Sequence, residues 1–447
     1  MLSCQHNSYS SQPVVIHNFC GGIKMSELLT TEKPAKEQPV KKKNKSKKSK
    51  WMKLRHRIVR NLAYCVLYPY SRLKYGITVE KNKNKEYHQY LILMNHQTAF
   101  DQFFLGMAFK ETIYYVASED LFSNGFISRL IAYLVAPIPI KKQTTDVHAI
   151  LNCMRVAKEG GSIAIAPEGN RTYAGDNVHI NPAIAKLAKK LSMPLTFYRI
   201  EGGYGVHPRW SDVIRKGKMR GYVSKIISPE ELKAMSDKEL NALIISELHQ
   251  NDCYMEGTYT HKNSAEYMER VFYVCPHCGL TEYESKGDTV RCKKCNQKIR
   301  YLPDLTLKAK NGEFPFTHTC DWFDYQCNYI NNLDVTSLSE NLLYSDNVKI
   351  SEVILYKSKK LIRRNARLSL YGDKVIVTAQ DGYSLTIPFA EASAFVVLGK
   401  NKLNIYYDDK VYQFKGGKRF NALKYVNLYY RYKNISEGNA DAEYLGL

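Results

Sequence analysis

The stretch that decides the fold runs from Tyr90 to Gln102 and reads YLILMNHQTAFDQ. It begins with an apolar run, Tyr90 to Met94, that has the length of a buried strand. His96 follows this run, and Asp101 comes five residues later. Residues i and i+5 lie about 140° apart around a helix, so these two side chains need a turn between them to meet. We therefore expect a strand, a turn, and a helix that begins at Asp101.

A second predicted strand ends in a similar set of polar residues. The run Ser162–Ala166 is apolar apart from its first residue, and residues 167–172 then read PEGNRT. They contribute Glu168, Gly169 and Arg171. Because the carboxyl ends of parallel strands meet at one edge of a sheet, we expect these residues to share a site with His96 and Asp101.

Short apolar runs alternate with longer helical patterns from about residue 76 to residue 250. The predicted strands are Leu91–Met94, Ile113–Val116, Ile138–Ile140, Ile163–Ala166 and Leu195–Ile200. The predicted helices are Phe103–Phe109, Phe126–Val135, Val147–Lys158 and Pro182–Leu191. This alternation predicts an α/β fold with a mostly parallel sheet flanked by helices.

The residue types at the shared edge suit one kind of chemistry. Asp101 can accept the proton on one imidazole nitrogen of His96, while the other nitrogen takes a proton from a substrate hydroxyl. Arg171 offers a forked cation that fits a phosphate, and Gly169 allows a close approach of the backbone to a ligand. Together they indicate acyl transfer to an alcohol that carries a phosphate. The alternative is a loop histidine with a helix-capping aspartate, beside a solvated Glu–Arg pair.

These blocks resemble the glycerolipid acyltransferase family, whose best-known members are 1-acyl-glycerol-3-phosphate acyltransferases. The family's first block is Asn-His-x4-Asp, which matches Asn95, His96 and Asp101. Its third block is usually Pro-Glu-Gly-Thr-Arg-Ser, and residues 167–172 differ from it at Asn170 and Thr172. The resemblance covers roughly residues 75–230. In the middle block a Lys, which we assign to Lys142, stands in place of the family's Arg, and the fourth block keeps only Pro194 of its two prolines.

The resemblance implies an O-acyltransferase of phospholipid synthesis. His96 would be the general base and Asp101 its orienting partner, while Glu168, Gly169, Arg171 and Lys142 would bind the acceptor. The acyl donor would be acyl-CoA or acyl carrier protein. A lysophosphatidate-type lysophospholipid is the first choice of acceptor, and glycerol 3-phosphate or another lysolipid stays open.

Four of the 11 cysteines form two tight pairs with the spacing Cys275-x2-Cys278-x13-Cys292-x2-Cys295. Such pairs are typical of zinc ribbons, in which four thiolates complete a tetrahedral shell. We expect a structural zinc ion there and no metal catalysis, because a closed shell has no open position for water. His277 lies inside the first pair, and we interpret it as a surface residue.

The net charge of +22 is concentrated near the N-terminus, where residues 38–79 contain 13 Lys or Arg and no Asp or Glu. We expect residues 51–75 to form an amphipathic helix at an anionic membrane surface, with Trp51 at headgroup depth. A core helix behind a solvated tail is the alternative. We expect Phe126–Val135 to be a core helix, with an acyl-chain channel or a bilayer contact as alternatives. The predicted location is cytoplasmic, peripheral on the inner face of the membrane.

The predicted organisation has seven parts. They are a disordered Lys-rich arm (1–50), the interfacial segment (51–75), an acyltransferase domain (76–260), the zinc ribbon (265–302), a linker (303–345), a small β-rich domain with a terminal helix (346–435) and a tail (436–447). The β-rich part resembles pleckstrin-homology or GRAM-like domains. Residues 20–25 read CGGIKM, which a ribosome-binding site followed by a start codon would encode, so we expect translation to begin at Met25.

A competing class is a non-catalytic binding protein that uses the ribbon and the basic arm to hold lipid or nucleic acid. We set nucleic acid aside, because the aromatic-basic signatures of RNA-recognition and homeodomain modules are absent from the sequence. The acyl-chain preference, the role of the β-rich domain and the oligomeric state do not follow from the sequence.

Overall fold

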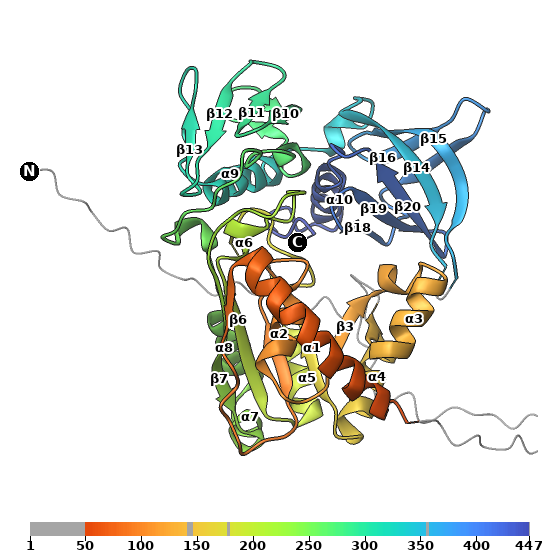
Figure 1. Cartoon of the computed structure of the whole chain (residues 1–447). Coiled ribbons are helices and arrows are strands. Elements are labelled where there is room, and N and C mark those ends of the chain that lie inside the picture. Colours follow the sequence, from red (N-terminus) through yellow and green to blue (C-terminus); the bar gives the residue numbers. More distant parts are fainter. Residues whose placement is uncertain (1–49, 141–145, 177–178, 355–356, 447) are drawn as a thin grey trace, which may run out of the picture. The chain divides into compact units, whose positions relative to one another are not determined.

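A computed structural model describes residues 50–140, 146–176, 179–354 and 357–446 (Figure 1). Residues 1–49 of the predicted Lys-rich arm lie outside the described residues, as does Lys142. The expected start at Met25 falls in the same undescribed arm.

The first sheet contains seven strands in the order β1-β7-β6-β2-β5-β3-β4. They are β1 (Ile77–Val79), β2 (Leu91–Met94), β3 (Ile113–Ser118), β4 (Ile138–Ile140), β5 (Ser162–Ile165), β6 (Leu195–Glu201) and β7 (Met219–Ile227). Neighbouring strands are parallel except β6 and β7. The predicted α/β fold with a mostly parallel sheet is confirmed.

Helices connect and cover these strands. They are α2 (Asp101–Ala108), α3 (Phe126–Val135), α4 (Val147–Lys158), α5 (Ala183–Leu191), α6 (Gly203–Val206), α7 (Pro229–Ala234) and α8 (Asp237–Leu248). Strand β2 pairs with both β5 and β6, and all four of its residues are buried. A strand covered on both faces needs apolar side chains at every position, which explains the unbroken run LILM. As predicted, helix α2 begins at Asp101.

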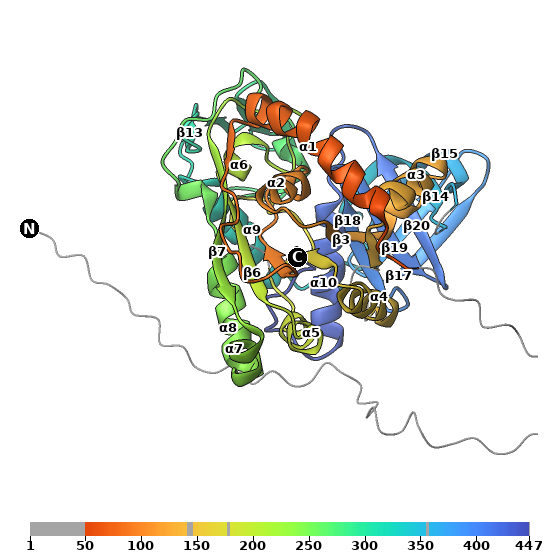
Figure 2. The same ribbon diagram turned by 60° about the horizontal axis from the view of Figure 1, so that its bottom comes forward.

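Helix α1 (Leu54–Tyr75) precedes the sheet and lies beside α3 in both views (Figures 1 and 2). Its exposed apolar residues recur at helical spacing along one face: Leu54, Ile58, Leu62, Val66, Tyr70 and Leu73. The indole N–H of Trp51 donates to the carbonyl of Ala136 at 3.0 Å, so this residue packs on the protein rather than facing outward. No helix among the described residues is long and apolar enough to cross a membrane.

Helix α3 is not the core helix that we expected. Ser128 is its buried residue, while Phe126, Ile127, Leu130, Tyr133 and Val135 are exposed. Gly125 has a φ of 57° and precedes the helix, whose polar Ser128 donates to the carbonyl of Leu121 at 2.6 Å. The apolar side chains of α3 therefore lie on its exposed face, and a hydrogen-bonding serine takes the buried position.

The cysteine-rich segment forms two small sheets. Strands β8 (Val274–Cys275) and β9 (Gly279–Leu280) make one pair, and β10 (Tyr283–Lys286), β11 (Thr289–Cys292), β12 (Lys298–Tyr301) and β13 (Leu307–Ala309) make an antiparallel sheet. The expected linker, 303–345, contains β13 and helix α9 (Thr319–Asn331). Trp322 of α9 is fully buried and stacks on Phe272 with a 3.8 Å centroid distance, so this segment is part of the core.

The C-terminal region is a second seven-stranded sheet in the order β17-β16-β15-β14-β20-β19-β18. Its strands are β14 (Tyr344–Glu352), β15 (Lys360–Leu370), β16 (Lys374–Thr378), β17 (Ser384–Pro388), β18 (Ala394–Leu398), β19 (Lys402–Tyr407) and β20 (Lys410–Gly416). Helix α10 (Leu423–Ser436) packs on β18, with Tyr429 stacked on Phe395. One cluster of buried apolar side chains extends through the first sheet, the cysteine-rich segment and this region.

Candidate functional site

The predicted pair forms at the end of β2. The Nδ1 atom of His96 lies 2.8 Å from Oδ2 of Asp101. An ionised carboxylate only accepts hydrogen bonds, so Nδ1 is the donor of this bond, and in the neutral imidazole Nε2 then has the lone pair. Asp101 is fully buried, while a quarter of the His96 side chain is exposed. The arrangement therefore presents a partly accessible base held by a shielded acid.

Asp101 is held by the turn that it follows. Its carboxylate accepts hydrogen bonds from the backbone N–H of Gln97 at 2.7 Å and of Thr98 at 2.9 Å. The hydroxyl of Thr98 donates to Oδ1 at 2.7 Å. Four donors, including the imidazole, thus fix one buried carboxylate. Such fixed donors orient the histidine without a reorganisation cost when a proton moves.

The second strand end joins the same site. Oε1 of Glu168 accepts from the backbone N–H of His96 at 3.1 Å, and the N–H of Thr172 donates to the carbonyl of His96 at the same distance. Both the N–H and the carbonyl of His96 are therefore hydrogen-bonded to the loop after β5. The structure brings His96, Asp101 and Glu168 together at one sheet edge, where the sequence placed them.

Gly169 makes the turn of this second loop. Its φ is 66°, and its N–H donates to the carbonyl of Ala166 at 3.0 Å. A Cβ at this position would meet no atom within 4 Å, so the requirement for glycine comes from the backbone angle and not from crowding.

Arg171 is partly buried behind this turn. Burial, and then the neighbouring guanidinium of Arg209, lower the pKa of Arg171 to about 10, while Asp101 opposes that shift. The side chain keeps its charge at neutral pH. Among the described residues, its buried Nη1 atom has no hydrogen-bond partner. Arg171 is therefore a cation with an unused donor close to the His96–Asp101 pair.

Comparison with known proteins agrees with this geometry. Residues 76–200 match the model of the family described as Acyltransferase. This part of the chain is an acyltransferase-like domain. The match contains β2, β5 and the loops that carry His96, Asp101, Glu168 and Arg171.

The chain is also similar to the crystal structure of the 1-acyl-sn-glycerophosphate (LPA) acyltransferase PlsC from Thermotoga maritima. The TM-score is 0.33 and the identity 20%, over 43% of this chain and 89% of that one. At these values we rest no argument on the likeness. No curated protein matches the sequence.

Sequence reasoning assigned no role to several residues at this sheet edge. The side-chain amide of Asn95 donates to the carbonyl of Ile200 and accepts from its N–H, both at 2.8 Å. These two bonds continue the hydrogen bonding between β2 and β6 beyond the end of β2. Gln97 is fully buried, and both atoms of its amide lack a hydrogen-bond partner among the described residues. Its position beside His96 was a signal that could have been used, because a buried polar residue at a strand end needs a partner.

His207 is a further residue that the sequence did not single out. It lies just after α6, is buried, and has its ring 5.9 Å from that of Tyr75. Burial, followed by the charges of Lys400, Arg171 and Arg215, lowers its pKa to about 3. His207 is therefore neutral at physiological pH, in a region crowded with cations.

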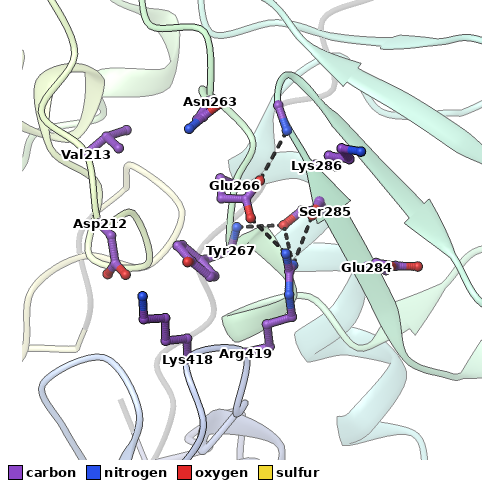
Figure 3. A pocket seen from close by; sticks show the side chains of 11 residues that line it. Asp212, Val213, Asn263, Glu266, Tyr267, Glu284, Ser285, Lys286, Lys418 and Arg419 are labelled. Atoms are coloured by element: carbon purple, nitrogen blue, oxygen red, sulfur yellow. Dashed lines mark hydrogen bonds and ion pairs between the residues drawn. The ribbon is translucent and has the colours of Figure 1, made fainter.

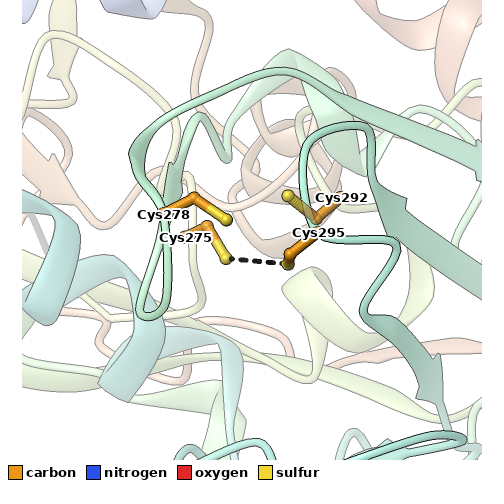
Figure 4. Close-up of side chains that lie close together, drawn as sticks. All are labelled: Cys275, Cys278, Cys292 and Cys295. Atoms are coloured by element: carbon orange, nitrogen blue, oxygen red, sulfur yellow. Dashed lines mark hydrogen bonds between the residues drawn. The ribbon is translucent and has the colours of Figure 1, made fainter.

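The four paired cysteines meet as predicted (Figure 4). Their Sγ atoms all lie within 4.8 Å of one another, and those of Cys275 and Cys295 are 3.8 Å apart. Four thiols at these distances fit a tetrahedral metal ion, so the set could hold zinc. His277 is exposed, as expected.

The two lysines inside the second cysteine pair have partners of their own. Lys293 forms an ion pair with Glu282 at 2.9 Å, and Lys294 donates to the carbonyl of Cys278 at 3.4 Å. One lysine is thus neutralised by a carboxylate, and the other supports the first turn.

A pocket of about 510 Å³ is lined by a different set of residues (Figure 3). Its lining includes Asp212, Tyr267 and Lys418, and Arg419 crosses one wall with ion pairs to Glu266 and Glu269. None of the site residues predicted from the sequence lines it. We assign the pocket no part in the chemistry of His96.

Proposed function

We propose that the protein transfers a fatty acyl group from an acyl thioester to the hydroxyl of a lysophosphatidate-type acceptor. The observation that carries this proposal is the His96–Asp101 pair, with a 2.8 Å bond, inside a segment that matches the Acyltransferase family. The sheet edge supplies a base and a cation but no nucleophilic serine in the paired motifs, so the nucleophile comes from the acceptor.

The reaction follows from the protonation states of the pair. Nε2 of His96 takes the proton of the acceptor hydroxyl as its oxygen attacks the thioester carbonyl. Asp101 stabilises the imidazolium that results. The tetrahedral intermediate then collapses, the C–S bond breaks, and His96 returns its proton to the departing thiolate. The products are an ester and a free thiol, and the histidine ends in its starting form.

The acceptor's phosphate fits the side of the site where Arg171 lies. Its unused Nη1 donor and its charge favour an anion. Glu168 takes another role in this proposal, since its carboxylate holds the backbone of His96 and so positions the base. Lys142 stays a candidate for the same phosphate from sequence alone.

We propose that α1 and α3 place the domain on an anionic membrane, with acyl-CoA or acyl carrier protein approaching from water. The exposed apolar face of α1 continues onto α3, where Arg55 packs 3.9 Å over the ring of Tyr133. Exposed cations, Lys53, Arg57, Arg72 and Lys74, flank this face. Apolar area beside basic side chains is the combination that binds anionic lipid surfaces.

We further propose that Cys275, Cys278, Cys292 and Cys295 hold a structural zinc ion. The ion would fix the two turns that carry the cysteine pairs. Because four thiolates fill its shell, it would take no part in acyl transfer.

The decisive experiment measures thiol release from a long-chain acyl-CoA in the presence of lysophosphatidate. We expect His96→Ala to lower the rate by at least about 10³-fold, because it removes the base. His88→Ala is the matched control, since His88 is an exposed histidine of the same domain. Equal rates in the wild type and His96→Ala would contradict the proposal. A wild type without activity on acyl-CoA would be tested with acyl carrier protein and other lysolipids.

A further inference from the structure

A hairpin of the C-terminal region lies against the acyltransferase domain. The buried guanidinium of Arg209 donates to the carbonyls of Gly399 at 3.4 Å and Val397 at 3.3 Å, which belong to the β18–β19 hairpin. The same group donates to the carbonyl of Arg171 at 3.2 Å and lies 4.1 Å above the ring of Tyr173. One side chain therefore contacts both the hairpin and the loop that carries Arg171.

Lys400 follows Gly399 at the tip of this hairpin. Its Nζ atom forms an ion pair with Asp212 at 2.9 Å, and 27% of its side chain is exposed. Asp212 also accepts from Arg270 at 2.7 and 3.2 Å. One carboxylate therefore serves two cations, and a positive charge is left over at the hairpin tip.

Neighbouring groups are affected by this charge and leave polar atoms unused. Burial, followed by the charges of Lys400 and Arg171, accounts for the low pKa of His207. In the described part of the chain, Nη1 of Arg171 and Nδ1 of His207 are buried and lack a hydrogen-bond partner. Cations gathered beside buried polar atoms without partners favour an anionic ligand.

We infer that Lys400, from the C-terminal β region, acts with Arg171 as a binding residue for the phosphate of the acyl acceptor. This inference rests on the proposed function and deepens it. Two cations of different geometry would bind the phosphate dianion: the planar guanidinium of Arg171 and the rotatable ammonium group of Lys400. Neutral His207 could contribute a hydrogen bond without adding charge. The C-terminal region is then part of the acceptor site.

A purely structural role explains these contacts less well. An ion pair that is partly exposed adds little to stability, and Asp212 is already satisfied by Arg270. A neutral residue at position 400 would avoid the repulsion between Lys400 and the neighbouring cations Arg171, Arg209 and Arg270. The cation is explained if it meets an anion there during the reaction.

The first test compares Lys400→Ala, Lys400→Gln and Lys400→Arg in the full chain. We expect the alanine and glutamine variants to raise the KM for lysophosphatidate at least 10-fold, while kcat and the KM for acyl-CoA change less than threefold. Lys400→Arg should recover most of the loss. Lys410→Ala is the matched control, because Lys410 pairs with Asp408 at 3.1 Å at the tip of another hairpin of the same sheet. An unchanged acceptor KM in folded Lys400→Ala and Lys400→Gln would overturn the inference.

A binding measurement separates this inference from the proposed reaction. Calorimetry with glycerol 3-phosphate and no acyl donor should give at least 10-fold weaker binding to Lys400→Ala than to the wild type or Lys410→Ala, and no binding of glycerol. Equal binding to the wild type and Lys400→Ala, or no binding to the wild type, would overturn the inference. Lys400-dependent binding without any His96-dependent thiol release would keep the phosphate site and contradict the proposed reaction.

Discussion

The His96 site and the cysteine cluster are both built from loops that follow strands, yet they differ in what they leave open. At the His96 site the donors converge on Asp101, which is buried, and a quarter of the histidine stays exposed. In the cysteine cluster four equivalent groups face one another across a few ångströms. The first arrangement holds a partly exposed imidazole against a shielded acid, and the second would satisfy all four thiols if a metal bound. In the proposed function, the first arrangement serves the chemistry and the second serves stability.

The largest effect should follow from changing the buried acid. We expect Asp101→Asn to lower the rate of acyl transfer about 10³- to 10⁴-fold, because an amide can donate to Nδ1 of His96 and move the proton to Nε2. Thiol release measured under saturating acyl-CoA tests this. The cysteine cluster should be unaffected, so the metal-to-protein ratio of the variant should equal that of the wild type. A variant with more than a tenth of the wild-type rate would remove the pair from the mechanism.

A substitution in the cysteine cluster tests the second of the two regions. Cys278→Ser should lose bound zinc and lower the free energy of unfolding by roughly 3 kcal/mol or more, since a structural metal contributes its binding energy to folding. Atomic emission and denaturant unfolding measure the two quantities. Cys65→Ser is the control, because Cys65 is an exposed thiol on α1. A zinc content that stays at the wild-type value in Cys278→Ser would refute the ligand assignment.

A smaller effect is expected from the exposed apolar face of α1, which belongs to neither site. Replacing Leu62 and Val66 together by serine should weaken binding to phosphatidylglycerol–phosphatidylcholine vesicles about 10-fold, because both side chains are mostly exposed on the apolar face of α1. Co-sedimentation measures this. Leu342→Ser changes a similarly exposed leucine elsewhere and should have no effect. If the double variant binds as well as the wild type, or the wild type prefers duplex DNA to vesicles, α1 is not the membrane-binding helix.

Sequence reasoning reached the parts of the site that depend on short-range patterns. The unbroken apolar run of β2 fixed a buried strand, and the five-residue spacing of His96 and Asp101 placed the start of α2. The cysteine spacing was sufficient to bring the four thiols together, because each pair closes its own tight turn.

What the sequence could not supply depends on orientation and on contacts between distant segments. The composition of α3 suggested a core helix, but composition does not say which face turns inward. Helix α9 carries the buried Trp322 in a run of Tyr, Asn and Cys without a clear apolar period, so it was predicted as a linker. Lys400 meets the acyltransferase domain through a fold that pairs segments far apart in the chain, and no local pattern marks such a contact.

Arg209 has a consequence for how this protein can change over evolution. Its guanidinium contacts the loop of Arg171, the ring of Tyr173 and the carbonyls of the β18–β19 hairpin. A substitution there would alter both the loop after β5 and the hairpin, whereas Lys400 at the hairpin tip makes no contact with the His96–Asp101 pair in the part of the chain that the structure describes. A lineage that keeps Arg209 can therefore exchange the tip residue, and with it the acceptor preference proposed for Lys400, without rebuilding the contact between hairpin and loop.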